Sequence, residues 1–251
     1  MTGRLEQIWR HPIKGHGFEA LTETPIRANE TIPWDRAWAV SHEASKATDG
    51  NWASCANFSR GAKAPHLMAI RAQLDEDSLQ LTLSHPEKTA LSFCPDKPDD
   101  IAKFVDWIAP LMPENRAAST GILRATEQGM TDTPFPSISL GNLATLRVLE
   151  QRAGQTLDVR RFRINLWAEG LAPFEEFEWV GKTVEIGEVP FKAEDRITRC
   201  ASTMANPETG RRDADPVAVM DTHWGHHDFG VALIAQAHGK IAVGAEVALA
   251  K

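Results

Sequence analysis

Cysteine is scarce in this chain of 251 residues, which has only Cys55, Cys94 and Cys200. An odd number of widely separated cysteines argues against the disulfide framework of small secreted proteins. The sequence also lacks any Cys-x-x-Cys pair. That absence argues against a zinc ribbon and against the common iron–sulfur clusters.

Long apolar runs and excess positive charge are missing as well. No stretch approaches the roughly 18 apolar residues of a membrane span, and residues 1–6 lack the apolar core of a signal peptide. We therefore expect a cytoplasmic protein with no membrane partner. Lys and Arg number 27 against 34 Asp and Glu, a net charge of −7, and this charge opposes binding to nucleic acid.

Within this acidic chain, arginines gather in two places. One group lies within four residues, and the other flanks Cys200; together they are Arg160, Arg161, Arg163, Arg196, Arg199, Arg211 and Arg212. Guanidinium groups bind carboxylates and phosphates through forked hydrogen bonds. The clustering therefore indicates a small anionic ligand.

Strand patterns dominate, in a chain whose length suits one large or two small domains and whose 42% apolar content can fill a core. Apolar residues alternate in patterns that predict three hairpins, over 67–83, 183–193 and 231–249. The turns are expected at 75–78, at Gly187-Glu188 and at His238-Gly239. The first arm of the third hairpin is nearly all apolar, which predicts a strand covered on both faces.

Two helices and one long connection complete the predicted organisation. Ile101 to Leu111 carries an apolar stripe that Asp99 or Asp100 can cap and Pro113 can end, and Leu143 to Leu149 can be capped by Ser139 or Asn142 and closed by Gly154. Residues 113–136 are rich in Pro, Thr and Gly. We interpret them as a boundary or long connection.

The segment from Arg161 to Leu166 is a candidate binding strand. Its period of two would place Arg161, Arg163 and Asn165 on one face and the apolar residues on the other. Such a row of donors suits a phosphate or the edge of a heterocycle. An amphipathic strand facing water is the alternative reading of the same pattern.

Cys200 follows Arg199, and this neighbour favours the thiolate, the form that attacks or binds a metal. A soft thiolate suits zinc, copper, iron or molybdenum. The alternative is an inert, buried cysteine, and we interpret Cys55 in that way, as a structural residue.

Two other segments carry weaker patterns. Three histidines, His223, His226 and His227, lie within five residues, but they do not have the spacing His-Glu-x-x-His of a zinc helix, and Gly225 favours a loop. We expect a solvated loop or a substrate contact there, close to the entrance of a site together with residues 113–136. Lys14 offers a point charge between glycine-rich neighbours, where a plain hairpin loop is the alternative.

Taken in order, several segments resemble the MOSC family with its N-terminal β-barrel domain, which includes amidoxime-reducing molybdoenzymes of mitochondria and bacterial relatives. The resemblance covers nearly the whole chain, and its landmarks are Pro12-Ile13-Lys14, Asp35-Arg36, Pro136-Ser137, 161–165, 181–187, Arg199-Cys200, 203–210, Phe229-Gly230 and 239–247. Three positions depart from the family pattern: Gly15, Ile164 and Asn206 stand where Ser, Pro and Asp are usual. The departure at Gly15 removes one hydroxyl contact.

The resemblance implies a mainly β fold, with an N-terminal barrel-like domain over 1–115, a MOSC barrel over 116–251 and a few helices. It implies that Cys200 ligates molybdenum held by a pterin dithiolene, the Mo-molybdopterin form of the molybdenum cofactor. The residues implied around the pterin and its phosphate are Lys14, Arg36, Ser137, Arg161, Arg163 and Asn165, and we add Arg199 as the neighbour of the thiolate. Domain junctions favour ligand sites, so we expect the cofactor between the two barrels.

The function implied is a molybdenum oxidoreductase that reduces small N-hydroxylated compounds. Its electrons would come from a separate partner of the ferredoxin, cytochrome b5 or flavin reductase type. A non-catalytic module in which Cys200 carries sulfur or holds the cofactor in transit is the alternative. A hydrolase with zinc on the three histidines is a third reading, on motif grounds alone.

Overall fold

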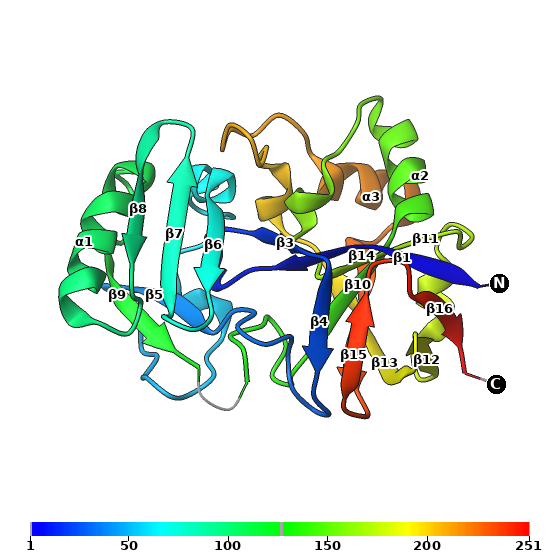
Figure 1. Cartoon of the computed structure of the whole chain (residues 1–251). Coiled ribbons are helices and arrows are strands. Elements are labelled where there is room, and N and C mark those ends of the chain that lie inside the picture. The colour runs from blue at the N-terminus through cyan, green and yellow to red at the C-terminus, as the bar shows by residue number, and fades with distance from the viewer. Residues whose placement is uncertain (1, 126–127, 251) are drawn as a thin grey trace.

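The computed structural model describes residues 2–125 and 128–250 of the chain. Two bodies lie side by side, with strands in both and helices at their outer surfaces (Figure 1). The predicted mainly β class with a few helices is confirmed. Met1, Thr126, Glu127 and Lys251, which fall within the predicted domains and connection, lie outside the described residues.

The larger body is a closed barrel of seven strands. Neighbouring strands pair in the order β11 (Leu166–Glu169), β10 (Ile138–Asn142), β14 (Asp228–Ala235), β13 (Val189–Thr198), β12 (Thr183–Ile186), β16 (Glu246–Leu249) and β1 (Gly3–Arg10). Antiparallel pairing of β1 with β11 closes the ring, and β3 (Glu19–Leu21) extends it from β1. Closure removes the exposed sheet edge that an open sheet would have. Its interior is apolar, with Leu5, Leu166, Val184 and Phe191 fully buried.

The smaller body combines two three-stranded sheets with a helix. One sheet contains β2 (Ile13–Lys14), β5 (Trp38–His42) and β9 (Ser119–Arg124), and the other contains β6 (Arg71–Asp75), β7 (Gln80–His85) and β8 (Lys88–Phe93). Helix α1 (Pro98–Ile108) inserts Phe104 between them, where it stacks on Phe93 with ring centroids 4.9 Å apart. Trp38 is fully buried in the same core.

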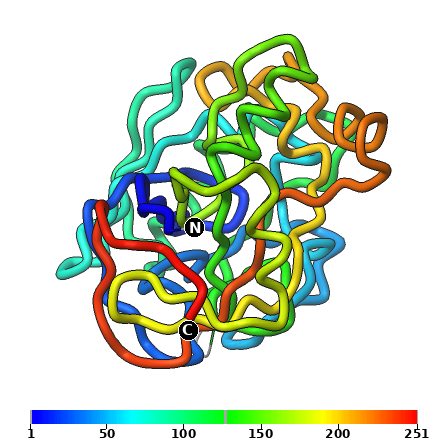
Figure 2. Tube along the Cα trace, turned by 90° about the vertical axis from the view of Figure 1, so that its right-hand side faces the viewer, coloured from blue at the N-terminus to red at the C-terminus, as the bar shows by residue number. Residues whose placement is uncertain are grey.

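Each of the two bodies contains segments from both parts of the sequence. β1 belongs to the barrel, and β4 (Glu23–Ile26) pairs with β15 (Gly239–Ala242) from the opposite end of the sequence. Figure 2 shows the red C-terminal segment running beside the blue N-terminal one. β9 follows residue 115 and pairs with β5. The division at 115/116 stays a prediction along the chain, while in space each body draws on both parts.

Two helices cover one side of the barrel. Helix α2 (Leu143–Ala153) packs Leu146 and Leu149 against the outside of the barrel wall, beside α3 (Pro216–Trp224). The predicted ends of α2 are confirmed: the Asn142 side chain accepts a hydrogen bond of 2.9 Å from Ala144 N, and Gly154 adopts φ 67°. Of the two candidate caps, Asn142 therefore performs the role and Ser139 does not.

Helix α1 differs at both ends from the prediction. It begins at Pro98 after Lys97, so Asp99 and Asp100 lie in the first turn, and it ends at Ile108, well before Pro113. Proline is favoured at the first helical position because its missing N–H needs no partner there. The Asp100 carboxylate instead accepts from Cys94 N at 3.1 Å and fixes the approach to the helix.

Local hairpins are confirmed and the distant pairing is not. β6–β7 and β12–β13 pair as predicted within 67–83 and 183–193, although residues 67–69 form a 3₁₀ turn. β14 is almost wholly buried, as its apolar run predicts. The third hairpin is wrong: β14 pairs with β10 and β13, whereas β15 pairs with β4. The predicted connection 113–136 likewise contains β9.

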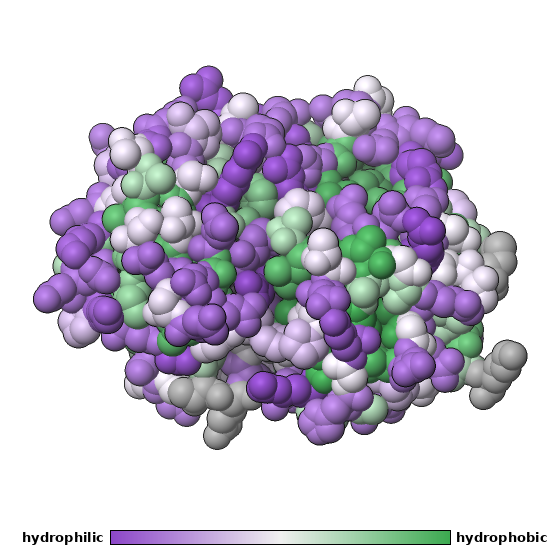
Figure 3. Space-filling model, in the orientation of Figure 1, coloured by the Kyte–Doolittle hydropathy of each residue, from purple (hydrophilic) through white to green (hydrophobic). Residues whose placement is uncertain are grey.

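The surface is mostly hydrophilic on the face in Figure 3, with apolar residues in separate patches. Among the described residues, the large apolar side chains that are exposed are Val180, Val243 and Leu249. No helix in the described part of the chain combines the length and the apolar character needed to cross a membrane.

Candidate functional site

A cavity of about 280 Å³ lies at the junction of the two bodies and receives side chains from both. Seven of the eight predicted site residues line it, namely Lys14, Arg36, Ser137, Arg163, Asn165, Arg199 and Cys200. They come from five separate stretches of the sequence. The fold therefore brings together groups that the sequence places up to 186 residues apart, counted from Lys14 to Cys200.

The segment 161–165 is not the predicted strand. Val159–Phe162 forms a 3₁₀ turn, Arg163 adopts the left-handed conformation with φ 49°, and β11 begins only at Leu166. A non-glycine residue at positive φ is uncommon and persists where surrounding contacts hold it. Here the Arg163 guanidinium donates to Gly17 O at 3.0 Å and to Ile13 O at 3.3 Å.

Arg161 is the predicted residue that the cavity does not include. The 3₁₀ turn directs its buried side chain away from Arg163, toward the loop that follows Cys200. Its guanidinium donates to Met204 O at 3.1 Å and pairs with Asp213 at 2.5 Å. Arg161 therefore holds the Cys200 loop in position from behind.

Arg36 lies at the centre of the polar network, also at positive φ, 52°. It pairs with Asp35, donates to Arg163 O at 2.8 Å and approaches Asn165 Oδ1 at 3.4 Å. Asp35 is fully buried, and although burial opposes its ionisation, Arg36 and hydrogen bonds from His11 hold the pKa of this carboxyl below its ordinary value. A buried ion pair thus fixes the Arg36 guanidinium in the cavity wall.

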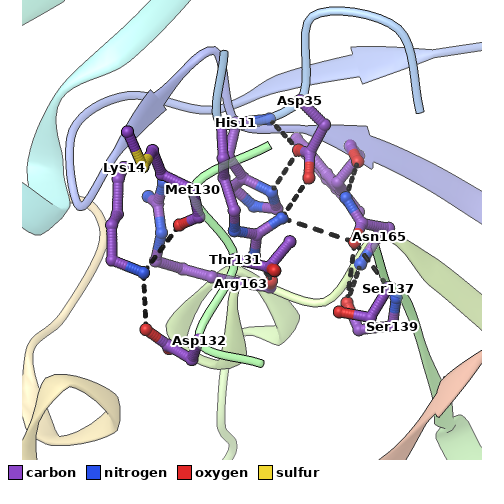
Figure 4. A network of polar contacts seen from close by, with 12 residues as sticks. His11, Lys14, Asp35, Met130, Thr131, Asp132, Ser137, Ser139, Arg163 and Asn165 are labelled. Carbon is purple, nitrogen blue, oxygen red and sulfur yellow. Dashed lines mark hydrogen bonds and ion pairs between the residues drawn. The ribbon is translucent and has the colours of Figure 1, made fainter. Parts of the chain in front are cut away.

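Lys14 lies at one end of the polar network, and Asn165 lies at the other (Figure 4). Its ammonium donates to Met130 O at 2.7 Å and pairs with Asp132 at 2.5 Å. Burial lowers the pKa of Lys14, and the Asp132 carboxylate opposes that shift. The Asp132 side chain is itself 78% exposed, so this pair is open to solvent on one side.

Asn165 joins two segments of the barrel, β10 and β1, through its amide. Its Oδ1 accepts from Ser139 N at 3.1 Å and from Ser139 Oγ at 2.8 Å, while its Nδ2 donates to Trp9 O at 3.1 Å (Figure 4). Ser137, on the same wall, shares a hydrogen bond of 2.8 Å with Thr133 Oγ1. Both residues are buried, and these hydrogen bonds hold their side chains in the cavity wall.

Cys200 lies at the end of β13 with an exposed side chain, and its Sγ is 3.2 Å from Ser202 Oγ. The preceding Arg199 is directed inward, where it donates to Phe229 O at 2.6 and 2.8 Å and to Phe162 O at 2.9 Å. Burial lowers the pKa values of Arg163 and Arg199 to about 9. Both guanidinium groups therefore keep their charge at neutral pH beside the thiol.

The cavity has more positive than negative side chains, and this excess affects which ligand it can bind. Lys14 and Arg36 have carboxylate partners, whereas Arg163 and Arg199 bond only to backbone carbonyls within the described part of the chain. Half-buried guanidinium groups without a counter-charge favour an anionic ligand. The exposed thiol of Cys200 adds a soft metal ligand when it is deprotonated. An anionic cofactor that carries a soft metal fits this donor set.

The structure also places in the cavity wall residues that we did not single out from the sequence. Cys55, which we interpreted as structural, lines the cavity together with Arg60, Met68 and Asp132. Cys55 Sγ accepts a hydrogen bond from the Arg60 guanidinium. No local pattern marked Cys55 or Arg60 as cavity residues, because their segment reaches the cavity through packing of the loop 59–61 against Gly15.

The histidine segment lies elsewhere. His223 and Trp224 end helix α3, Gly225 closes that helix with φ 70°, and none of the three histidines lines the cavity. The loop prediction is thus wrong for His223. Among residues 2–125 and 128–250, no group of three His, Cys, Asp or Glu side chains is arranged to hold a metal ion. Of the segment 113–136, residues 131–133 do line the cavity.

Comparisons with known proteins find distantly similar sequences and a solved structure. Mitochondrial amidoxime-reducing component 1 of Mus musculus is 22% identical over 88% of this chain and 71% of its own length. Molybdenum cofactor sulfurase of Drosophila willistoni is 22% identical over 86% of this chain, which spans only 29% of that protein. Among solved structures, the YUAD protein from Bacillus subtilis aligns over 98% of this chain and 94% of its own, with 11% identity and a TM-score of 0.48.

Family profiles match nearly the whole sequence. The MOSC N-terminal beta barrel domain matches residues 2–120, and the MOSC domain matches residues 131–248. The second match contains Cys200 together with Ser137, Arg163, Asn165 and Arg199, and the first contains Lys14 and Arg36. The chain therefore belongs to the MOSC family, as a protein that combines a MOSC N-terminal beta barrel domain with a MOSC domain.

Proposed function

We propose that this protein is a molybdenum-cofactor-binding oxidoreductase that reduces small N-hydroxylated compounds. The observation that carries the proposal is the exposed Cys200 thiol in a cavity whose half-buried Arg163 and Arg199 have no carboxylate partner among the described residues. The similarity to a protein named for amidoxime reduction supports the choice of substrate class.

In this proposal, Cys200 ligates the metal. Arg163, Arg199 and Lys14 neutralise the phosphate and pterin oxygens, while Arg36, Ser137 and Asn165 offer hydrogen bonds. When bound, the cofactor supplies a two-electron redox centre, and the protein supplies position and charge. Arg161 acts from outside the cavity, because its bonds to Met204 O and Asp213 hold the Cys200 loop.

The electrons come from a separate protein of the ferredoxin, cytochrome b5 or flavin reductase type. We also propose a cytoplasmic location, because Cys55, Cys94 and Cys200 are all free thiols. A reducing compartment keeps such thiols available, and Cys200 must stay reduced to bind a metal.

Metal content tests the assignment of the ligand. Wild type, Cys200→Ala and the control Cys94→Ala should be purified from a host that makes molybdopterin, and their molybdenum measured by mass spectrometry. We expect near-stoichiometric molybdenum in wild type and in the control, whose cysteine is remote from the cavity, and a large loss in Cys200→Ala. Background metal in wild type, or equal metal in Cys200→Ala, would refute the assignment.

A cofactor or sulfur carrier is the second candidate. The exposed thiol of Cys200 and the similarity to a molybdenum cofactor sulfurase favour it, since a carrier must present its sulfur to a partner. Reduction of 6-hydroxylaminopurine with an artificial electron donor separates the two. Turnover by metal-loaded protein supports the reductase, and no turnover together with cofactor transfer to an acceptor enzyme supports the carrier.

A further inference from the structure

Arg60 contributes a guanidinium group to the cavity that the fold itself does not use. Its only side-chain partner among the described residues is the sulfur of Cys55, and it has no ion pair within that part of the chain. A thiol sulfur is a weak acceptor, so most of the five donors of this guanidinium stay available. By contrast, Lys14, Arg36, Arg163 and Arg199 are all held by carboxylates or carbonyls.

The backbone at Arg60 is held firmly. Ser59 N donates to Val40 O at 2.9 Å, and the Arg60 carbonyl accepts from Lys63 N and Ala64 N, both at 3.0 Å. Gly15 permits this placement: a Cβ at position 15 would lie 3.1 Å from Arg60 Cα, and its φ is +75°. The glycine that departs from the family pattern therefore lets the loop 59–61 pack directly beside Lys14.

The same loop touches the Cys200 segment from the other body. A Cβ on Gly61 would lie 3.6 Å from Ser202 Cβ, and Arg212 donates to Ala62 O at 2.8 Å. Ser202 Oγ is in turn 3.2 Å from Cys200 Sγ. Arg60 and Cys200 therefore occupy adjoining walls of one cavity, contributed by different domains. A small molecule held at Cys200 would have this half-buried guanidinium beside it.

We propose that Arg60 is a specificity-determining residue that binds a carboxylate or phosphate group of the substrate, so that the protein prefers anionic N-hydroxylated compounds to neutral ones. The inference rests on the proposed function, since it names the substrate class of the same site. The chemistry that recognises the ligand is the forked hydrogen bond of a guanidinium to an oxyanion. The cofactor's own phosphate is the other source of such an oxyanion, and the experiment separates the two.

The test compares two probes that differ by one charge, benzamidoxime and 4-carboxybenzamidoxime. Wild type, Arg60→Gln, Arg60→Lys and the control Arg27→Gln are assayed by steady-state kinetics and by calorimetric binding, with molybdenum content and thermal melting recorded for each. Arg27 is an exposed residue paired with Glu30 and lies outside the cavity. It therefore controls for the loss of one positive charge.

We expect Arg60→Gln to raise KM and Kd for the carboxylate probe about ten-fold, the size of one charge-assisted hydrogen bond. Its kcat, its values for the neutral probe and its molybdenum content should stay unchanged. Arg60→Lys should recover part of the loss, and Arg27→Gln should match wild type. This split between KM and kcat, confined to one probe, would not arise from a merely structural role.

Three outcomes overturn the inference. Equal losses for both probes would assign Arg60 a structural role, and loss of molybdenum without a change in probe preference would assign it to the cofactor phosphate. No preference of wild type for the carboxylate probe would also refute it. If wild type holds no molybdenum and reduces neither probe, the proposed function fails. The anion site is then still tested by calorimetry: wild type should bind the carboxylate probe more tightly than the neutral one, and Arg60→Gln should lose this preference.

Discussion

Replacing Asn165 by Leu should destabilise the protein strongly, although the two side chains have similar size. Asn165 is 1% exposed, and its amide satisfies three groups from two strands of the barrel: Ser139 N, Ser139 Oγ and Trp9 O. Leucine can neither donate nor accept. The substitution therefore leaves two or three buried polar groups without these partners.

The magnitude follows from the number of groups left unpaired. Each buried group that loses its partner costs about 1 to 3 kcal/mol, so two or three such groups should lower the free energy of unfolding by at least roughly 2 to 3 kcal/mol. That is a large part of the 5–15 kcal/mol or so that stabilises a typical domain.

Equilibrium urea unfolding followed by tryptophan fluorescence measures this change, through a lower midpoint at an unchanged slope. The matched control is Asn51→Leu, because Asn51 is exposed and bonds only to Thr48 and Asp49 in its own turn. That variant should stay within about 0.5 kcal/mol of wild type. A loss below about 1 kcal/mol in Asn165→Leu would show that the Asn165 hydrogen bonds do not stabilise the barrel.

Three further changes probe other parts of the structure. Lowering the pH from about 6.5 to about 5 should reduce stability, because burial holds the pKa of His11 at about 3 and of His16 at about 4, while the unfolded chain titrates near 6.5, so that unfolding takes up about two protons. Urea midpoints across this range measure the slope, which His16→Phe should roughly halve; a flat profile would contradict the argument. Glu176→Gln should raise the unfolding free energy near pH 8, because burial raises the pKa of Glu176 and ionisation of this carboxyl costs stability as the pH rises; a loss of more than about 1 kcal/mol in the Gln variant would refute this assignment. Arg161→Met should lower the unfolding free energy by roughly 1 to 3 kcal/mol, since Met204 O loses one of its two donors and keeps only Asp213 N, while the half-exposed Asp213 carboxylate regains water. In Arg161→Met, amide hydrogen exchange should quicken across 201–204 and stay unchanged in α1. Equal exchange at 201–204 in Arg161→Met and wild type would show that Arg161 does not position this loop.

The sequence predicted those features whose causes are local. The Asn142 cap and the Gly154 end of α2 depend on one turn of backbone, and the two short hairpins depend on alternating residues beside a turn. β14 was predicted as a buried strand because its apolar run is continuous. Pairing over long distances was not predictable in this way. β15 joins β4, more than 200 residues away in sequence, because the closed barrel leaves β14 already paired on both edges.

The same distinction between local and long-range causes applies to the candidate site. Residue chemistry and family resemblance pointed to Cys200 and to six of the seven residues expected around the cofactor, and these line one cavity. The strand predicted over 161–165 failed because contacts to Gly17 O and Ile13 O hold Arg163 in a left-handed conformation that alternation cannot anticipate.

By itself, the sequence determined that this is a mainly β protein with a cysteine beside arginines, because residue type and short-range spacing carry that information. Only the tertiary structure decided which cations lack carboxylate partners, that Arg161 lies behind the Cys200 loop, and that Cys55 and Arg60 join the cavity from the other domain. The physical reason is that charge balance and cavity walls depend on contacts between distant segments, such as the loop 59–61 resting on Gly15. The sequence therefore identifies Cys200 as a thiol, and the fold places it in the cavity.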